Sequence, residues 1–411
     1  MKIAVIGLGF VGLTTALGFA NKGFEVYGFD NDKKKSDAIE KGNIPFYEEG
    51  LSEALSSVLN KKFYVLPTMQ EAVSEANAVF LCVGTPCNNE GEANLEYLKE
   101  AVTEAVKYIL DDCVLIIKST VPPGTTENIV ASLANDKSVA MNPEFLREGC
   151  AWFDFMYPDR IIAGVGDDRA TVVIKEIYEP FSVPIYFVSR STAEFVKYLS
   201  NTLLANLISF SNEMAGLAEQ IGNINVSDAF KVLCEDKRLK GAGICSYIYP
   251  GCGYGGSCLP KDNTALLTVS KKLNYKMPIL DSVISTNIDM PVKTAKRIIS
   301  KVADKDTNIG ILGLSFKPNS DDVRFSPAVA IISELIKQGY HNIYAYDPMA
   351  NETFARANHF STVTYCDTSK DVCEHCSVVA IITTWKEFSE IDKSYPNVVF
   401  VDCRYFLGGE L

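Results

Sequence analysis

The sequence lacks a hydrophobic run long enough to cross a bilayer, so we expect no membrane-spanning segment and no membrane partner. It also lacks the small-residue cleavage site of a signal peptide, because residues 1–7 lead straight into the pattern of a strand. Both absences favour a cytoplasmic location. With 411 residues, 47% of them hydrophobic and 22% charged, the composition is typical of a soluble enzyme with two or three domains.

An excess of basic residues is also missing, since the formal net charge is -12. A phosphate backbone requires a basic surface, so this balance argues against nucleic acid as a partner. An anionic ligand would therefore have to be bound by local cations.

The 12 cysteines do not form a regularly spaced disulfide framework, because they are scattered through apolar runs. We therefore expect them to be reduced. Cys373, Glu374, His375 and Cys376 resemble half of a metal site, but no second pair of Cys and His residues stands near them in the sequence. We expect no metal.

A dinucleotide-binding pattern opens the chain. Residues 2–6 form a short apolar strand, residues 7–12 have the spacing G-x-G-x-x-G, and residues 13–20 are helical in pattern. Gly7 would make the tight turn, Gly9 would let the backbone approach a pyrophosphate at the helix N-terminus, and Gly12 would allow close packing of helix and strand.

A second strand pattern at residues 25–29 ends in Asp30. A carboxylate at this position accepts hydrogen bonds from the ribose hydroxyls of NAD and repels the 2′-phosphate of NADP. The sequence therefore favours NAD as the cofactor. The alternative is a glycine turn in an α/β domain that binds no nucleotide.

Further apolar strands follow at residues 78–83, 114–118 and 139–141. In a doubly wound sheet their carboxyl ends line the cofactor crevice, so the loops after them should meet there. The last loop carries Glu144 and Glu148, which would share one face if the run were helical and would suit general-base chemistry. The alternative is the solvated edge of a helix.

The middle of the chain, from residue 191 to residue 218, predicts a long helix without proline. Apolar residues cover most of its circumference, which is typical of a domain's central helix or of a subunit interface. Lys197 and Asn201 are four residues apart and so present a cation and an amide on one face, where they would suit an oxyanion.

The last segment restarts an α/β pattern after the charged residues 301–306. Strand patterns at residues 309–314, 342–347, 377–382 and 398–402 predict a second nucleotide-binding-like domain. The loop 316–324 and Arg404 would offer cations to a diphosphate.

The glycine-rich stretch at residues 249–262 delivers Cys258 directly before Pro260, Lys261 and Asp262. Its four glycines allow the backbone to lie close to a ligand, and neighbouring ionisable groups would favour the thiolate. These residues alone support two interpretations equally: a nucleophile, or a small hydrophobic side chain in the core.

Four motifs occur in order: Ser-Thr-Val-Pro at 119–122, Asn-Pro-Glu-Phe-Leu-Arg-Glu-Gly at 142–149, Gly-Gly-Ser-Cys-x-Pro-Lys-Asp at 255–262 and Phe-Lys-Pro at 316–318. With them the chain resembles the UDP-glucose/GDP-mannose dehydrogenases over essentially its whole length. The resemblance implies an α/β fold with two Rossmann-like doubly wound domains, joined by a long central helix and a helical dimerisation domain. It implies an NAD-binding domain at 1–188, the helical domain at 189–300 and a UDP-sugar-binding domain at 301–411.

The resemblance also implies a reaction, in which a homodimer oxidises the C6 alcohol of a nucleotide sugar to the acid with two NAD⁺. Cys258 resembles the nucleophile, and Glu144 the general base. The oxyanion and substrate contacts would be Lys197 and Asn201, while Thr120 and Asp262 would order water. The cofactor contacts that the motifs and the resemblance indicate are Gly7, Gly9, Phe10, Val11, Gly12, Asp30, Lys35, Thr85, Pro86, Ser119, Thr120, Glu148, Lys261 and Arg324. The expected substrate contacts are Glu144, Phe145, Leu146, Arg147, Glu148, Lys197, Asn201, Tyr247, Tyr249, Gly253, Tyr254, Gly255, Phe316, Lys317 and Arg404.

Two details of the resemblance bear on the sugar. Residues 158–160 resemble the UDP-sugar branch, and Ser257 argues against the N-acetylmannosamine branch, so UDP-glucose is the expected substrate. The family usually has an arginine that reaches across the dimer shortly before the glycine loop, but Ala242 stands at that position here. Arg238 and Lys240 are the candidate replacements.

Three alternatives remain open from the sequence. The first is a hydroxyacid-type dehydrogenase of similar architecture, which would make one NADH per substrate and need no cysteine. The second is a dehydrogenase of another nucleotide sugar, such as a UDP-N-acetylhexosamine or GDP-mannose. The third is a sensor that binds a sugar nucleotide and NAD without turnover, for which a cysteine beside a lysine and an asparagine would have no use.

Asp30 generates a prediction about the cofactor. We expect NAD⁺ to be preferred over NADP⁺, because the carboxylate binds ribose hydroxyls and repels a phosphate. The measurement is the ratio of kcat/KM for the two cofactors, and equal values would contradict the assignment of Asp30.

Overall fold

The computed structural model describes residues 1–88, 90–240 and 243–407, so Ala242 and the last four residues of the third expected domain lie outside the described part. The chain divides into two compact units, Met1–Ser200 and Asn201–Leu411. Helix α9 (Arg190–Ile221) contributes residues to both. Within the described ranges no helix is long and apolar enough to cross a membrane.

The first unit is built on an eight-stranded sheet of order β3-β2-β1-β4-β5-β6-β7-β8. Its pairs are parallel, apart from the antiparallel pair β6 and β7. The strands are β1 (Lys2–Ile6), β2 (Glu25–Phe29), β3 (Phe63–Val65), β4 (Ala78–Leu81), β5 (Val114–Ile117), β6 (Ser138–Met141), β7 (Ile161–Val165) and β8 (Ile185–Val188).

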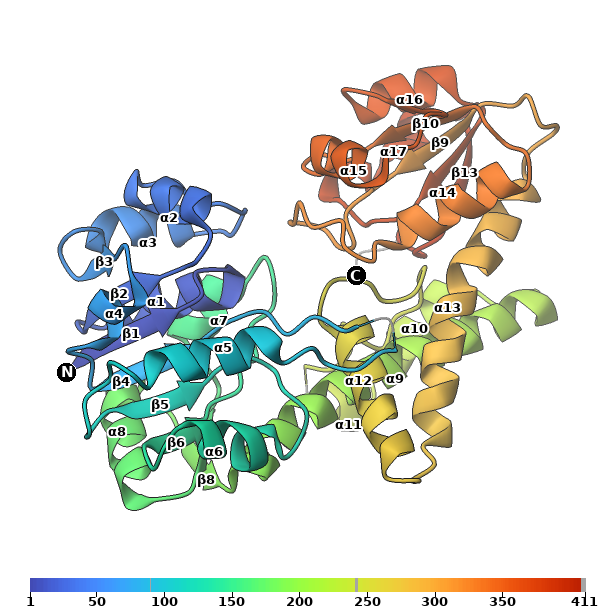
Figure 1. The fold of residues 1–411 in the computed structure, drawn as a ribbon. Helices are drawn as coiled ribbons and strands as arrows, with labels where there is room; N and C mark the ends of the chain where they lie inside the picture. Colours follow the sequence, from blue (N-terminus) through green and yellow to red (C-terminus); the bar gives the residue numbers. More distant parts are fainter. Residues whose placement is uncertain (89, 241–242, 408–411) are drawn as a thin grey trace. The chain divides into compact units, whose positions relative to one another are not determined.

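Helices cover both faces of this sheet (Figure 1). Alternate residues of β1 show why: Ile3 and Val5 belong to one buried apolar cluster, and Ala4 and Ile6 belong to another on the opposite face. The helical elements are α1 (Phe10–Asn21), α2 (Lys33–Glu40), α3 (Leu51–Val58), α4 (Met69–Val73), α5 (Glu96–Ala105), the π-helix η1 (Thr126–Val130), α6 (Ala131–Leu133), α7 (Ala151–Met156), α8 (Asp168–Tyr178) and the 3₁₀-helix η2 (Glu179–Phe181).

The second unit begins with the rest of α9 and four further helices, α10 (Val226–Cys234), α11 (Lys237–Lys240), α12 (Leu259–Lys272) and α13 (Pro278–Ile299). A parallel five-stranded sheet of order β11-β10-β9-β12-β13 follows. Its strands are β9 (Ile309–Leu312), β10 (Ile343–Tyr346), β11 (Val363–Tyr365), β12 (Val378–Ile381) and β13 (Val399–Asp402). The helices around it are α14 (Pro327–Lys337), α15 (Asn351–Asn358), α16 (Ser369–His375), the 3₁₀-helix η3 (Lys386–Phe388) and α17 (Ile391–Ser394).

The predicted doubly wound sheets and the long helix are confirmed, because both strand orders reverse at the first strand of the sheet and α9 spans 32 residues. One expectation is wrong. Residues 142–148 form no helix; they are an irregular segment followed by a turn, so Glu144 and Glu148 are not placed on a common helical face. The backbone N–H groups of this segment are bound by side-chain carboxylates instead, Leu146 by Glu144 and Arg147 by Asp154.

Candidate active site

The loops after β1, β4, β5 and β6 lie at one edge of the first sheet, because these strands are parallel neighbours. The Thr85 hydroxyl donates to the carbonyl of Thr120 at 2.8 Å, and the Ser119 hydroxyl donates to the carbonyl of Val83 at 2.6 Å. The loops after β4 and β5 therefore meet, as the sequence predicts.

The glycine-rich turn after β1 is shaped by close backbone contacts. Gly7 has a φ of +88°, and a Cβ on Gly12 would lie 1.7 Å from the Gly7 carbonyl oxygen. Gly9 has open space within 4 Å of its Cβ position, and no side chain caps the N-terminus of α1 that it precedes. Phe10 and Val11 form the first helical residues. An uncapped helix N-terminus beside open space fits the pyrophosphate of a dinucleotide.

The Asp30 carboxylate lies at the end of β2 and is largely buried. It accepts the Leu8 backbone N–H at 2.7 Å and the Asp32 N–H at 2.9 Å, and Lys35 Nζ lies 2.8 Å from its Oδ2. Asp30 therefore holds the glycine-rich turn in place, and the arrangement fits the ribose end of NAD.

Glu144 and Lys197 form a buried ion pair within the first unit. The Nζ of Lys197 lies 3.0 Å from Oε1 of Glu144, and the two side chains are 5% and 6% exposed. The other carboxylate oxygen accepts the Leu146 N–H at 2.6 Å. Lys197 also lies over the Phe145 ring, and Arg160 lies over the same ring at 5.1 Å from its centroid. The sequence did not indicate Arg160 as a contact of this loop.

Two carboxylates fix the rest of the 142–151 loop. Asp154 binds the Arg147 guanidinium at two points, 2.7 and 3.0 Å, and accepts the Arg147 N–H at 2.9 Å. Glu48 accepts the N–H groups of Gly149 and Ala151 at 2.8 and 2.6 Å. Glu48 is about a hundred residues away in sequence, so no local pattern could have identified it.

Glu194 holds the Thr120 loop to α9. Its side chain is 0% exposed, and its two oxygens accept the N–H groups of Gly124 and Thr126 at 2.6 and 2.7 Å. Burial raises the pKa of this carboxyl group. It stands one helical turn before Lys197, so the loop and the lysine are fixed to the same part of the helix.

The second unit contains the cysteine and its neighbours. Cys258 is exposed and directly precedes the 14-residue helix α12. Asp262, in the first turn of that helix, is 1% exposed; it accepts Asn201 Nδ2 at 2.6 Å and pairs with Lys261 Nζ at 2.6 Å. The alternative that Cys258 packs as a small hydrophobic residue in the core is wrong, because the side chain is at the surface at the positive end of a helix.

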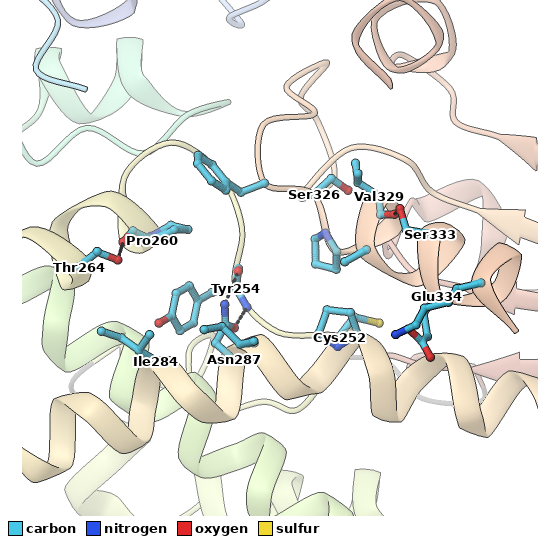
Figure 2. A pocket seen from close by; sticks show the side chains of 16 residues that line it. Cys252, Tyr254, Pro260, Thr264, Ile284, Asn287, Ser326, Val329, Ser333 and Glu334 are labelled. Atoms are coloured by element: carbon cyan, nitrogen blue, oxygen red, sulfur yellow. Dashed lines mark hydrogen bonds and ion pairs between the residues drawn. The ribbon is translucent and has the colours of Figure 1, made fainter. Parts of the chain in front are cut away.

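The glycine loop before Cys258 is shaped by side chains from α9 and α13. Asn212 accepts the Gly251 N–H at 2.6 Å, and Asn287 binds both the N–H and the carbonyl of Tyr254, at 2.7 and 3.0 Å (Figure 2). A Cβ on Gly253 would lie 2.7 Å from the Asn287 amide oxygen, and one on Gly255 would lie 2.3 Å from the Phe325 carbonyl. These contacts explain the glycines.

Arg404 lies against the same loop. A Cβ on Gly251 would come within 2.5 Å of Nη1 of Arg404, so glycine is required for the guanidinium to lie there. Its buried Nε has no hydrogen-bond partner among the described residues. A donor of this kind fits an anionic ligand.

The other expected substrate and cofactor residues of the second unit are placed as follows. Tyr249 donates to the Tyr405 carbonyl at 2.7 Å, and Tyr247 lies partly exposed in a turn. Lys317 lies over the Phe316 ring, while Arg324 is bound at two points by Asp322, at 2.7 and 2.9 Å. Their roles toward a ligand stay predictions.

A pocket of about 670 Å³ in the second unit lies between the glycine loop, α12, α13 and α14 (Figure 2). Cys252, Tyr254 and Pro260 line it, but Cys258, Lys317 and Arg404 do not. It is therefore distinct from the surface that carries the cysteine.

No group of three or more His, Cys, Asp or Glu side chains in the described part of the chain is arranged to hold a metal ion. Cys373 and Cys376 belong to a buried apolar cluster, and burial raises the pKa of each thiol to about 12. His375 stacks on Tyr344 with the ring centroids 5.3 Å apart.

Comparisons with known proteins cover the whole chain. Three domain models of the UDP-glucose/GDP-mannose dehydrogenase family match: the NAD-binding domain at residues 1–182, the central domain at 191–289 and the UDP-binding domain at 310–409. UDP-glucose 6-dehydrogenase from Rickettsia conorii is 37% identical, with 100% of this chain and 96% of the relative covered. UDP-glucose 6-dehydrogenase YwqF from Bacillus subtilis is 34% identical, with 98% and 91% covered.

Solved structures agree with these sequence matches. A UDP-glucose dehydrogenase from Pyrobaculum islandicum has a TM-score of 0.93 and 36% identity, with 98% of this chain and 94% of that chain covered. A UDP-D-ManNAc dehydrogenase from Pyrococcus horikoshii has a TM-score of 0.86 and 28% identity, with 100% and 97% covered.

The placement of the cysteines generates a prediction. Iodoacetamide at neutral pH should modify the two exposed thiols, Cys258 and Cys150, well before Cys113, Cys373 and Cys376. Burial raises the pKa of those three to about 12, so their thiolate fraction at pH 7 is roughly a thousandfold below that of an ordinary thiol. A time course of peptide mass spectra measures the order. Equal rates for Cys373 and Cys258 would contradict the structure of this site.

Proposed function

The chain belongs to the UDP-glucose/GDP-mannose dehydrogenase family, and on that premise we propose that it oxidises UDP-glucose to UDP-glucuronate through a covalent intermediate on Cys258. Its cofactor is NAD, as the NAD-binding domain and the relatives indicate. The residues at the edge of the first sheet, with Asp30 and the uncapped start of α1, fit that cofactor. NAD⁺ supplies the hydride acceptor, and two equivalents are consumed for each sugar.

The proposed chemistry uses Cys258 as the nucleophile and Glu144 as the base. Oxidation of the C6 alcohol removes a hydride and the hydroxyl proton and leaves an aldehyde. The Cys258 thiolate adds to the aldehyde carbon, and loss of a second hydride from that carbon converts the thiohemiacetal to a thioester. Water then breaks the carbon–sulfur bond and gives the carboxylate and the free cysteine. Glu144 takes the proton of this water, while Lys197 and Asn201 stabilise the oxyanions.

The observation that carries the proposal is the pairing along α9. Lys197 lies 3.0 Å from the proposed base Glu144, and Asn201, one turn further, hydrogen-bonds at 2.6 Å to Asp262, which follows Cys258 by four residues. A single-step dehydrogenase needs neither an exposed cysteine nor the hydrogen-bonded pair of Asn201 and Asp262. A sensor needs no base at all.

The choice of UDP-glucose rests on the relatives and on the UDP-binding domain. The unpartnered Nε of Arg404 supports an anionic ligand, and Lys317 and Arg324 add further cations to this unit. The alternative is another nucleotide sugar, since the UDP-D-ManNAc dehydrogenase of Pyrococcus horikoshii shares the fold at 28% identity. Ser257 argues against the N-acetylmannosamine branch. Measuring NADH formation with UDP-glucose, UDP-galactose, UDP-N-acetylhexosamines and GDP-mannose decides between them.

The proposal extends to the assembly and the compartment. Along α9, Leu203, Phe210, Met214, Leu217 and Ile221 are 43–64% exposed and recur at helical spacing. A continuous apolar stripe of this kind on a long helix suits a homodimer interface. Cysteine-dependent chemistry and free NAD⁺ both suit the reducing cytoplasm, which we propose as the location.

Substitutions at Glu144 and Cys258 test the mechanism. Glu144→Gln keeps the shape of the side chain but cannot accept a proton, so it should form the thioester and stall. We expect a burst of about two NADH per active site, a steady state at least about a hundredfold slower, and the mass of the acyl group retained on the protein. Stopped-flow absorbance and intact-protein mass spectrometry measure these quantities.

Cys258→Ser is the companion variant, and it should lose net acid formation because a serine hydroxyl is a much weaker nucleophile at neutral pH. If Glu144→Gln turns over like the parent, another group is the base. If Cys258→Ser retains full two-step activity, the reaction has no covalent intermediate on this residue.

The proposed dimer has its own test. Changing both Leu203 and Leu217 to glutamate places charges in the stripe and should give a monomer by light scattering coupled to size exclusion. Val172, an apolar residue on α8 that is more exposed than either leucine, provides the control, and Val172→Glu should leave the mass unchanged. A parent protein that is monomeric at micromolar concentration would refute the proposed interface.

A further inference from the structure

Lys118 is a buried lysine that the proposed chemistry does not use. It directly follows β5, it is 4% exposed, and it precedes Ser119 and Thr120. Its Nζ donates to the side-chain oxygen of Asn142 at 2.9 Å. An ammonium has three donors, and among the described residues this is its one hydrogen bond, with no carboxylate within ion-pairing distance.

Asn142 links this lysine to the loop of Glu144. Its side-chain oxygen also accepts the hydroxyl of Tyr178 from α8, and its amide nitrogen donates to the Ile162 carbonyl at 2.9 Å. Its backbone N–H donates to the Ile117 carbonyl at 2.8 Å, directly before Lys118. The start of the loop is therefore fixed by a closed set of buried hydrogen bonds two residues before Glu144.

The charged and titratable groups around Lys118 come from each neighbouring element. They are Cys82 after β4, Glu144 after β6, Tyr178 on α8 and Lys197 on α9. Burial lowers the pKa of Lys118 to about 8, with the positive charge of Lys197 acting in the same direction and Cys82 and Glu144 opposing it. Burial also raises the pKa of Cys82 to about 12 and that of Tyr178 further, so both are neutral at pH 7. Among these groups Glu144 is the one carboxylate, and its charge acts on Lys118.

A lysine that is buried without an ion pair destabilises a fold, since its charge loses water and gains no carboxylate. A methionine of similar length would fill the same space without that penalty. A costly charge beside a catalytic carboxylate therefore calls for a functional explanation.

We propose that Lys118 is a positioning residue for the reaction, which orients the Asn142–Glu144 turn and supplies a second positive charge beside Glu144. The inference rests on the proposed role of Glu144 as the base. A positive charge near a carboxylate favours its ionised form, and only the ionised form of Glu144 can take a proton from water.

Lys118→Met and Tyr178→Phe separate charge from hydrogen bonding. Both variants remove one hydrogen bond to the same Asn142 oxygen, but only the first removes a charge. On the acid side of the pH profile, kcat falls as the base becomes protonated. In Lys118→Met we expect the midpoint of this fall to move up by about one pH unit, so that kcat below the midpoint is about tenfold lower than in the parent and recovers at higher pH. In Tyr178→Phe the midpoint of the fall in kcat at acid pH should be the same as in the parent.

Thermal unfolding gives an independent readout. Because the folded-state pKa of Lys118 is lowered from 10.5 to about 8, the unfolded chain binds more protons between these values, and the stability of the parent should rise with pH there. At pH 7 the melting temperature of Lys118→Met should equal or exceed that of the parent. The difference between the two melting temperatures should shrink as the pH rises above about 8. A lysine with a purely structural role predicts a lower melting temperature instead.

Four proteins measured together keep the two proposals separate: the parent, Lys118→Met, Tyr178→Phe and Glu144→Gln. If Glu144→Gln stalls after its burst while Lys118→Met keeps the parent's pH profile, the role of Lys118 is refuted and that of Glu144 stands. If Lys118→Met and Tyr178→Phe shift the acid midpoint of the kcat profile equally, the charge of Lys118 is not the cause of the shift. If Glu144→Gln turns over like the parent, the proposed base itself is wrong.

Discussion

The buried ion pair between Glu144 and Lys197 is the interaction on which the proposed site depends. Both side chains are almost fully buried, so the two charges stabilise each other away from water. Removing one partner from such a pair typically costs about 3–5 kcal/mol, because the remaining charge has neither water nor a counterion. The pair thus fixes the Glu144 loop on α9. The same helix carries Asn201 one turn later, where it binds Asp262 in the first turn of α12.

Around this pair, buried carboxylates hold the loops that the sheet alone would leave loose. Glu194 binds the backbone of the Thr120 loop, Glu48 binds the end of the Glu144 loop, and Asp30 binds the glycine-rich turn. Each accepts hydrogen bonds from backbone N–H groups, which are rigid donors. A charged acceptor binds a buried amide more strongly than a neutral one, so these loops keep one geometry without regular secondary structure.

Much of the fold could be predicted from the sequence, because its strongest signals are local. Continuous apolar runs such as Val114–Ile117, and the glycine spacing at residues 7–12, identify buried parallel strands and the dinucleotide turn. The edge strands β3 and β11 are only three residues long, and β8 is partly exposed, so their periodicity is too weak to read. The spacing of Glu144 and Glu148 is compatible with a helix, but the carboxylates that bind the N–H groups of this loop, such as Glu48, cannot be identified from that spacing.

The residues of the candidate site also divide into those that the sequence indicates and those that only the structure shows. Cys258, Lys197, Asn201 and Glu144 stand in motifs that can be read along the chain. Glu48, Glu194 and Lys118 act on loops through contacts that only the folded chain creates, and the sequence around a single carboxylate or lysine does not indicate its partner. Their burial identifies them, since a charged group is buried only where a partner or a function compensates for its lost hydration.

The central claim is a four-electron oxidation in which one cysteine carries the substrate between two hydride transfers. The most direct measurement is the amount of NADH formed for each UDP-glucose consumed, with the sugar product identified in the same reaction. The account predicts a ratio of two and UDP-glucuronate as the product. A ratio of one, with an aldehyde or ketone released, would contradict it.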